Sequence, residues 1–335
     1  MRDQPSVAIT VLLSVFVVVA MVRAAAVERA LVAAPTVDLR SLTVQRSGEA
    51  GDQTVGNDRP ATEEAVRAIA TAYPERVDRY ELRDGDWALL VGERWFYWSE
   101  GRLLPDEMRE YSEDFTAMGF YGYTVGEHQP PEISEEFEAA MRKRAAEGNG
   151  EPMWLSTGRH QEFYEALYEF NNAPEADRTV QSTTFLGRRT RVHPMIVEPL
   201  ISVETDIRAA MQEDPQVRKF VDNISSVSGF HWREILGSIS RSYHAYGTAV
   251  DLLPHRYDGF GYWRWAQQSG IQEWWALPPD RRHSVPDAVV DAFEHHGFVW
   301  GGKWIGFDPV HFEYRPEVIQ YAEMRLENPS LPALY

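Results

Sequence analysis

The stretch RSYHAYGTAVDLL, residues 241–253, contains the pattern Ser-x-His-x-x-Gly-x-Ala-x-Asp. Its second half is apolar and β-branched, so we expect a strand from Thr248 to Leu253, ended by Pro254. Asp251 lies in the middle of this apolar run, where a buried carboxylate without a partner costs several kcal/mol. We therefore expect Asp251 to be paired, hydrogen-bonded or bound to a metal.

Gly247 stands just before this strand, which indicates a tight turn or a close backbone approach. Such a turn would bring His244 back over the strand face that carries Asp251. The alternative is a solvated Asp251 on an edge strand and an ordinary polar His244.

A second segment, DPVHFE at residues 308–313, also places polar side chains, His311 and Glu313, among apolar ones. We expect a strand from Val310 to Tyr314, with His311 and Glu313 on one face because side chains alternate along a strand. Asp308 precedes this strand in a turn marked by Asp-Pro. It could hold a water molecule beside the site, or it could simply start the turn.

Together the two segments supply two imidazoles and one carboxylate, with a spare carboxylate beside them. This is the ligand count of a hydrolytic zinc site whose fourth position is left for water. A carboxylate that touches the water and not the metal is the usual general base of such sites. The other histidines fit less well: His255 and His283 lie in loops, and His295 and His296 close a helix whose dipole they complement.

These residues resemble the zinc D-Ala-D-Ala carboxypeptidase family of peptidoglycan peptidases, which includes VanY-like and endolysin-like enzymes. The first motif of that family matches without a gap from Ser242 to Asp251, and the second, a carboxylate three residues before the last His, matches Asp308 and His311. The surrounding sequence is similar to the Asp-using, endopeptidase-like branch, and the resemblance covers roughly residues 190 to 325.

The resemblance implies that His244, Asp251 and His311 bind one Zn²⁺ and that Asp308 is the general base. The family also uses an upstream Arg to stabilise the oxyanion; Arg233 is our candidate, although it falls two positions late, and Arg241 is the alternative. Glu313 could orient His311 or could be a surface residue.

The implied substrates are peptidoglycan stem peptides, cut as by a D-Ala-D-Ala carboxypeptidase or an L-Ala-D-Glu endopeptidase. The alternative function is a catalytically inactive, zinc-containing module that binds cell wall. Asp308 favours the enzyme, because a binding module needs no base.

Composition limits the partners and the setting of this protein. The chain has 335 residues and a net charge of −18, which argues against nucleic acid and anionic membrane surfaces as partners. It has no cysteine, so disulfides and thiolate ligands are excluded. The apolar run from Val7 to Val22, which follows Arg2 and precedes an Ala-rich cleavage site, predicts an export signal or a membrane anchor. We therefore expect a periplasmic or extracellular location.

We predict four regions along the chain: a signal or anchor at 1–26, a flexible linker at 27–61, an N-terminal elaboration at 62–185 and the zinc peptidase domain at 186–330. The elaboration contains an aromatic cluster between Trp87 and Tyr123 that fits either a core or a carbohydrate-binding face.

The chain lacks the strand-helix-strand rhythm of a doubly wound sheet, so we expect an α+β fold. Strands at 189–192, 226–230, 248–253 and 310–314 should form one mainly antiparallel sheet that carries the zinc site and is flanked by helices. Further helices are expected at 62–72, 134–146, 161–171, 199–211, 286–296 and 316–326, and further strands at 77–82, 87–91 and 95–98.

Overall fold

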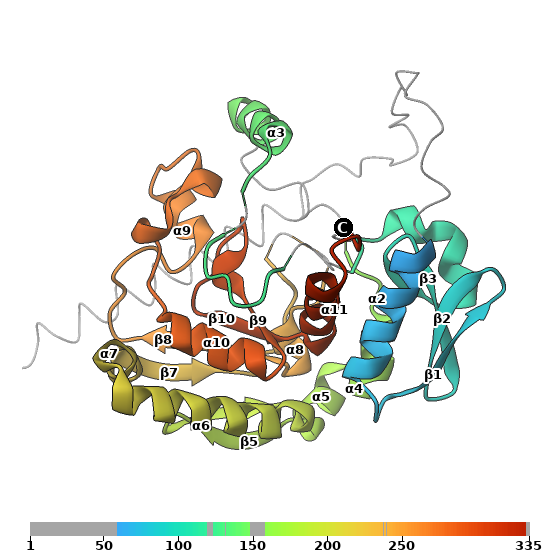
Figure 1. Ribbon diagram of the computed structural model, residues 1–335, viewed down its shortest axis with the longest axis horizontal. Coiled ribbons are helices and arrows are strands. Elements are labelled where there is room, and N and C mark those ends of the chain that lie inside the picture. Colours follow the sequence, from blue (N-terminus) through green and yellow to red (C-terminus); the bar gives the residue numbers. More distant parts are fainter. Residues whose placement is uncertain are drawn as a thin grey trace, which may run out of the picture. The chain divides into compact units, whose positions relative to one another are not determined.

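The computed structural model describes residues 59–118, 123–130, 132–147, 158–236, 238 and 240–332, with the side chains of 59–61 left out. The expected export signal and most of the expected linker lie outside these residues. Residues Thr54–Tyr335 form one compact unit. It combines helices with small antiparallel sheets, which confirms the α+β class (Figure 1).

The sheet that matters for function has the strand order β7-β8-β10-β9, and all its pairs are antiparallel. Its strands are β7 (Ile224–Ser228), β8 (Ala249–Pro254), β9 (Phe298–Trp300) and β10 (His311–Tyr314). Strands β8 and β10 pair in the register that sets Asp251 opposite His311. The predicted pairing of these two segments is therefore confirmed.

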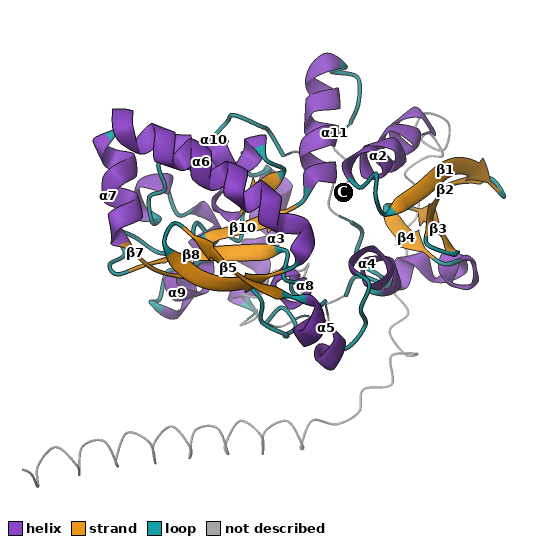
Figure 2. Ribbon diagram, turned by 90° about the horizontal axis from the view of Figure 1, so that it is seen from below, coloured by secondary structure: helices purple, strands orange, loops and turns teal. Residues whose placement is uncertain are grey.

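The two faces of this sheet differ in polarity, as the alternation along the strands predicts. Val250, Leu252 and Phe312 point into an apolar core with helices α6 (Val197–Glu213) and α10 (Asp287–His295). The Phe293 ring of α10 stacks on Phe312 at 3.8 Å between centroids. Figure 2 places both helices along one side of the sheet. The apolar face thus fixes the strands, and the alternating residues Asp251 and His311 fall on the other face.

One expected strand pairs elsewhere. The segment predicted at 189–192 is β6 (Arg188–Val192), and it forms a separate two-stranded sheet with β5 (Gln181–Phe185). The two-residue turn between them, Leu186 and Gly187, has positive φ at both positions, which is typical of a tight hairpin. The backbone hydrogen bonds of β6 are therefore made with its neighbour in the chain, β5. The fourth strand of the larger sheet is instead β9, which has three residues and was too short to predict.

The N-terminal part consists of a helix and a four-stranded antiparallel sheet. Helix α2 (Arg59–Ala72) is followed by β1 (Val77–Arg83), β2 (Asp86–Val91), β3 (Arg94–Ser99) and β4 (Arg102–Leu104), in the order β1-β2-β3-β4. The helix and the first three strands confirm the prediction. A short 3-10 helix, η2 (Asp106–Asp114), follows the sheet.

Seven further α-helices of the described ranges follow the N-terminal part along the chain. They are α3 (Glu135–Ala146), α4 (Glu162–Tyr168), α5 (Ala173–Thr179), α7 (Pro215–Asn223), α8 (Tyr243–Tyr246), α9 (Trp263–Gln268) and α11 (Pro316–Glu327). Helix α4 is shorter than expected because Glu169 adopts a left-handed conformation at its C-terminus. None of the helices in the described ranges is long and apolar enough to cross a membrane.

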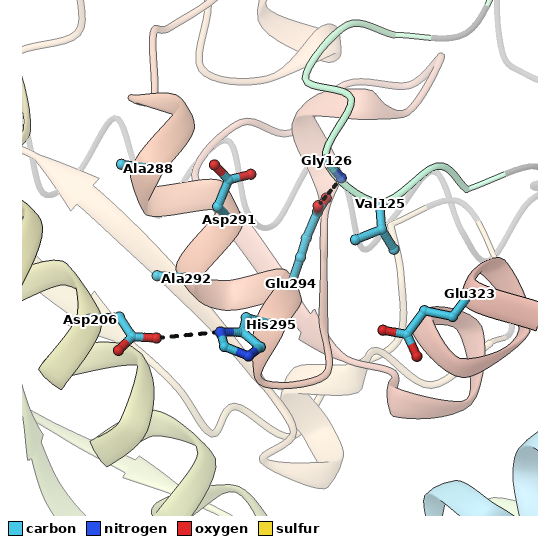
Figure 3. Close-up of a pocket in the computed structure, with 9 residues that line it drawn as sticks. All are labelled: Val125, Gly126, Asp206, Ala288, Asp291, Ala292, Glu294, His295 and Glu323. Carbon is cyan, nitrogen blue, oxygen red and sulfur yellow. Dashed lines mark hydrogen bonds and ion pairs between the residues drawn. The ribbon is translucent and has the colours of Figure 1, made fainter. Parts of the chain in front are cut away.

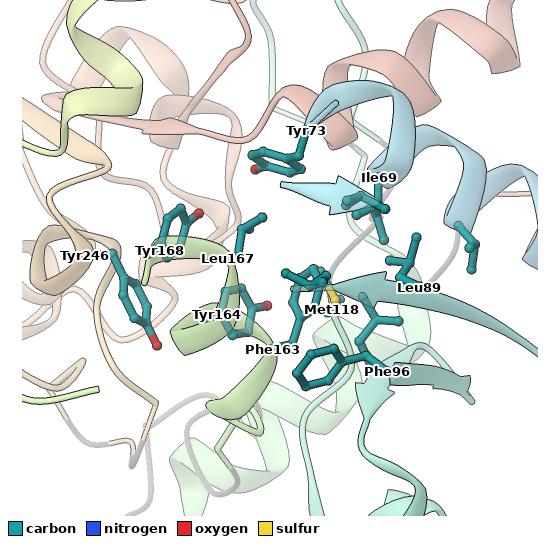
Figure 4. Packing of buried hydrophobic residues seen from close by; sticks show 14 of the residues in the cluster. Ile69, Tyr73, Leu89, Phe96, Met118, Phe163, Tyr164, Leu167, Tyr168 and Tyr246 are labelled. Carbon is teal, nitrogen blue, oxygen red and sulfur yellow. The ribbon is translucent and has the colours of Figure 1, made fainter. Parts of the chain in front are cut away.

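Aromatic residues of the N-terminal part lie in the core. Phe96 and Trp98 are buried together with Tyr164 of α4 and Tyr246 of α8 in one apolar cluster. Figure 4 shows Phe96, Tyr164 and Tyr246 of this cluster. The Tyr246 hydroxyl donates a hydrogen bond of 2.6 Å to Gln161 Oε1. Phe96 and Trp98 therefore support the helix that carries His244 and do not offer a carbohydrate-binding face.

Candidate metal centre

A short helix and a glycine turn place His244. Ser242 caps α8, and its hydroxyl accepts a 3.3 Å hydrogen bond from the His244 N–H. Gly247 ends the helix with φ of +71°, and a Cβ at this position would lie 2.7 Å from the His193 nitrogen. Only glycine combines this conformation with this close approach. The predicted turn is therefore present, and it brings His244 to the strand face of Asp251.

Three ligand atoms converge on that face. His244 Nε2 lies 3.0 Å from Asp251 Oδ1, and His311 Nδ1 lies 2.7 Å from the same oxygen. The two ring nitrogens are 3.1 Å apart. The structure thus brings together the three side chains that the sequence selected.

The outer nitrogens of both rings have partners that fix their tautomers. His244 Nδ1 is 2.6 Å from the Gly229 carbonyl oxygen and donates its proton there. His311 Nε2 is 3.1 Å from Glu313 Oε1 and donates to that carboxylate. When both rings are neutral, each therefore turns a nitrogen lone pair toward Asp251. Two lone pairs and a carboxylate oxygen this close together repel one another unless a cation lies among them.

The donor set and its spacing fit zinc. Tetrahedral zinc holds nitrogen and oxygen ligands at about 2.0–2.1 Å, which separates the ligand atoms by about 3.3 Å. The observed separations of 2.7–3.1 Å need shifts of only a few tenths of an ångström. His244, Asp251 and His311 could therefore hold the ion and leave its fourth position free.

The charges of these side chains depend on one another. Burial raises the pKa of Asp251, but the charges and hydrogen bonds of His244 and His311 outweigh it and lower this pKa below its usual range. Burial lowers the pKa of His311, yet Asp251 and Glu313 raise it well above the ordinary value. Positive charge at the centre of these three side chains therefore stabilises the site.

Asp308 lies in the tight turn that leads into β10. Its N–H donates to the Gly301 carbonyl at 2.9 Å, and its carbonyl accepts from the His311 N–H at 3.0 Å. Burial raises the pKa of its carboxyl to about 8; the neighbouring His311 and Arg233 oppose this shift, and the Asp251 and Glu313 carboxylates add to it. The carboxyl is therefore close enough to His311 and Asp251 for their charges to act on it.

The two arginine candidates differ in their surroundings. Arg233 is exposed, and its charge lowers the pKa of Asp308. Arg241 instead forms a 3.1 Å ion pair with Glu165, and its guanidinium lies 4.4 Å from the centre of the Trp232 ring. Arg241 is thus held by structural contacts, whereas the charge of Arg233 acts on the carboxyl that we selected as the base.

Two arginines that act on Glu313 were not predicted from the sequence. Burial raises the pKa of Glu313, but His311 and two arginines, Arg315 and Arg159, lower it below its usual value. Arg315 Nη1 lies 3.9 Å from Glu313 Oε2. The position of Arg315, two residues after Glu313, was a usable signal. Arg159 is far away in the chain, so only the fold could place it there.

Comparison with known families agrees with this geometry. A family model described as D-alanyl-D-alanine carboxypeptidase matches residues 237–314. The match covers part of the chain and contains His244, Asp251, Asp308 and His311. It supports a peptidase of that kind at the level of the family.

A second family model, described as a domain of unknown function, matches residues 65–120, which contain most of α2 and the strands β1 to β4. No curated protein matched the chain, and no solved structure matched it either.

Proposed function

We propose that this protein is an exported zinc peptidase that hydrolyses amide bonds in the stem peptides of peptidoglycan. The observation that supports it best is the convergence of His244 Nε2, Asp251 Oδ1 and His311 Nδ1 beside the Asp308 carboxyl. All four residues lie inside the segment that matches the carboxypeptidase family. Export rests on the apolar run at residues 7–22, which agrees with a substrate outside the cytoplasmic membrane.

In this proposal His244, Asp251 and His311 hold the zinc ion. Bound zinc would polarise the scissile carbonyl and make the attacking water more acidic. Asp308 takes a proton from that water on a carboxylate oxygen and later donates it to the leaving amine. Burial raises the pKa of the Asp308 carboxyl to about 8 in the metal-free site. The positive charge of a bound zinc ion would oppose this shift and so favour the ionised, proton-accepting form.

Two further residues support these steps. Glu313 accepts the Nε2 proton of His311 and keeps the Nδ1 lone pair directed at the ion. Arg233 places a positive charge near the oxygen that becomes negative in the transition state. We propose this role for Arg233 because its charge reaches Asp308, whereas Arg241 is paired with Glu165.

The second candidate is a zinc-containing module that binds cell wall without cleaving it. Asp308 argues against it, since a largely desolvated carboxyl is unfavourable and a binding module has no use for it. Within the enzyme class, an Asp three residues before the last His favours the endopeptidase-like branch.

The deciding experiment is digestion of purified peptidoglycan with the zinc-loaded chain, followed by mass spectrometry of the fragments. We expect loss of terminal D-Ala or cleavage between L-Ala and D-Glu, abolished by a chelator and restored by zinc. Asp308→Asn is the matched control, and it should cleave far more slowly. If the zinc-loaded protein releases nothing but co-sediments with peptidoglycan, the binding module is correct.

A further inference from the structure

A second group of histidine and carboxylate side chains joins α6 and α10. Asp206 comes from α6, and His295 and His296 come from the C-terminal end of α10. One ligand atom from each of the three lies within 4.8 Å of the others. His296 Nε2 is 2.8 Å from Asp206 Oδ2, and His295 Nδ1 is 3.7 Å from the same oxygen. Figure 3 shows Asp206 and His295 pointing toward one another from the two helices.

The two imidazoles are arranged to act together. Their rings are stacked, with centroids 4.9 Å apart and an angle of 20° between the planes. Consecutive residues on a helix usually point in different directions, so two rings that share one carboxylate form a specific arrangement. The end of α10 also carries the negative pole of the helix dipole, which favours a cation.

The cluster lies beside a cavity that carries negative charge and is open to solvent. A cavity of about 420 Å³ adjoins the cluster, and its lining includes the carboxylates of Asp206, Asp291 and Glu323. The His295 side chain is 79% exposed and that of Asp206 is 44% exposed, so an ion can enter from solvent. Carboxylates gathered at a cavity raise the local concentration of cations.

We propose that Asp206, His295 and His296 form a second metal site, for a divalent transition metal of the zinc class, that clamps α10 to α6. Two imidazoles and one carboxylate select zinc, cobalt, nickel or copper over magnesium and calcium, which prefer oxygen ligands. Solvent water completes the coordination from the cavity. The clamp holds the helix layer beneath the sheet, where Phe293 of α10 stacks on Phe312.

This second site is separate from the proposed catalytic one. Its three ligands belong to the helix layer, whereas His244, Asp251 and His311 lie on the sheet face that points away from that layer. We therefore expect that substitutions in one site remove its bound metal ion and leave the ion of the other site in place. This independence allows one experiment to test each site without relying on the other.

The test is titration of the metal-free, full-length chain with Co²⁺, followed by absorbance and by calorimetry. The wild-type chain should bind about two equivalents, because each three-residue set holds one ion. His244→Ala/His311→Ala and His295→Ala/His296→Ala should each bind about one. His128→Ala is the control. His128 Nε2 lies 2.7 Å from Oδ1 of Asp291, a residue that lines this cavity, but His128 is not one of the three ligands, so both equivalents should remain.

Each outcome decides one site. A wild-type chain that binds one ion, and keeps it when His295 and His296 are replaced, overturns the second site and leaves the proposed function intact. A chain that loses its only ion with His295 and His296 supports the second site and contradicts the catalytic one. Asp206→Asn provides a milder variant, since it replaces one carboxylate oxygen by an amide nitrogen on a side chain that is 44% exposed. Circular dichroism checks its fold. It should weaken the second equivalent alone; unchanged binding of both would refute the clamp.

Discussion

His311 and Asp251 lie directly opposite each other on adjacent antiparallel strands, with His311 Nδ1 2.7 Å from Asp251 Oδ1. This register sets the whole site, because a slip of one residue would turn His311 toward the apolar core that holds Phe312. The packing of Val250 and Phe312 against α6 and α10 therefore determines where Asp251 and His311, two of the proposed metal ligands, point.

Asp251 and Asp308 should respond differently to the same substitution. Asp251→Asn replaces a charged ligand by a weaker neutral one, so zinc affinity and activity should fall together. Asp308→Asn leaves the three ligands intact, so zinc should stay bound while turnover falls about 10²–10⁴-fold. Metal analysis and rate measurements on both variants check this. Release of zinc from the Asp308→Asn variant would show that Asp308 is a metal ligand and not the base. Zinc retention with the parent rate would place the base elsewhere, with Glu313 as the next candidate.

Glu313 should act on zinc through His311. Glu313→Gln removes the carboxylate that accepts the Nε2 proton, so zinc affinity should fall by about 10–100-fold. The matched control is Glu317→Gln, because Glu317 is also buried and pairs with Arg315 and Tyr73 instead of His311. This control should lower stability and leave zinc affinity unchanged. Competition titration with a chelating dye measures both; equal affinity losses would mean that Glu313 has only a structural role.

Gly247 should tolerate alanine less well than another glycine of similar conformation. Gly247 and Gly187 have φ of +71° and +76°, but only Gly247 has atoms within 4 Å of a built Cβ. Gly187→Ala should cost only the left-handed conformation, about 1–2 kcal/mol. Gly247→Ala should lose about 1–3 kcal/mol more, because the His193 backbone must move. Denaturant unfolding of the two variants gives the difference, and equal losses would show that the close approach costs nothing.

His193 should make the fold sensitive to acid. Burial lowers its pKa to about 4, assisted by Arg76 and opposed by the Tyr168 carbonyl and Glu169. Its Nδ1 accepts a 3.1 Å hydrogen bond from the Met195 N–H, which requires the neutral ring. The folded state therefore resists protonation, and its stability falls as the pH drops from about 6.5, where the unfolded His begins to bind a proton, toward 4.

His193→Asn provides the reference for this effect, since asparagine can accept from Met195 without titrating. The difference in unfolding free energy between wild type and variant should change by about 2 kcal/mol between pH 7 and pH 5, with the wild type losing more. Urea unfolding at the two values measures it. A difference that does not vary with pH would show that His193 titrates normally in the fold.

Local pattern was enough to predict the elements that build the site. Thr248 to Leu253 and Val310 to Tyr314 are strands within one residue of the prediction at each end, and Glu313 shares the face of His311. The prediction from sequence was wrong for short strands, whose formation and pairing depend on the neighbouring strands. Strand β9 has only three residues. Strand β6 pairs with β5 because a tight two-residue turn places these two strands side by side.

The sequence by itself was enough to select the candidate ligands and the candidate base. One turn joins His244 to Asp251 and another joins Asp308 to His311, so the spacing alone limits their geometry. Only the tertiary structure decided which nitrogen of each ring faces inward, since the Gly229 carbonyl and Glu313 fix the tautomers. The approach of Arg159 to Glu313 and of Asp206 to His296 was decided in the same way. These contacts join segments far apart in the chain, and packing of apolar faces places them without leaving a local pattern.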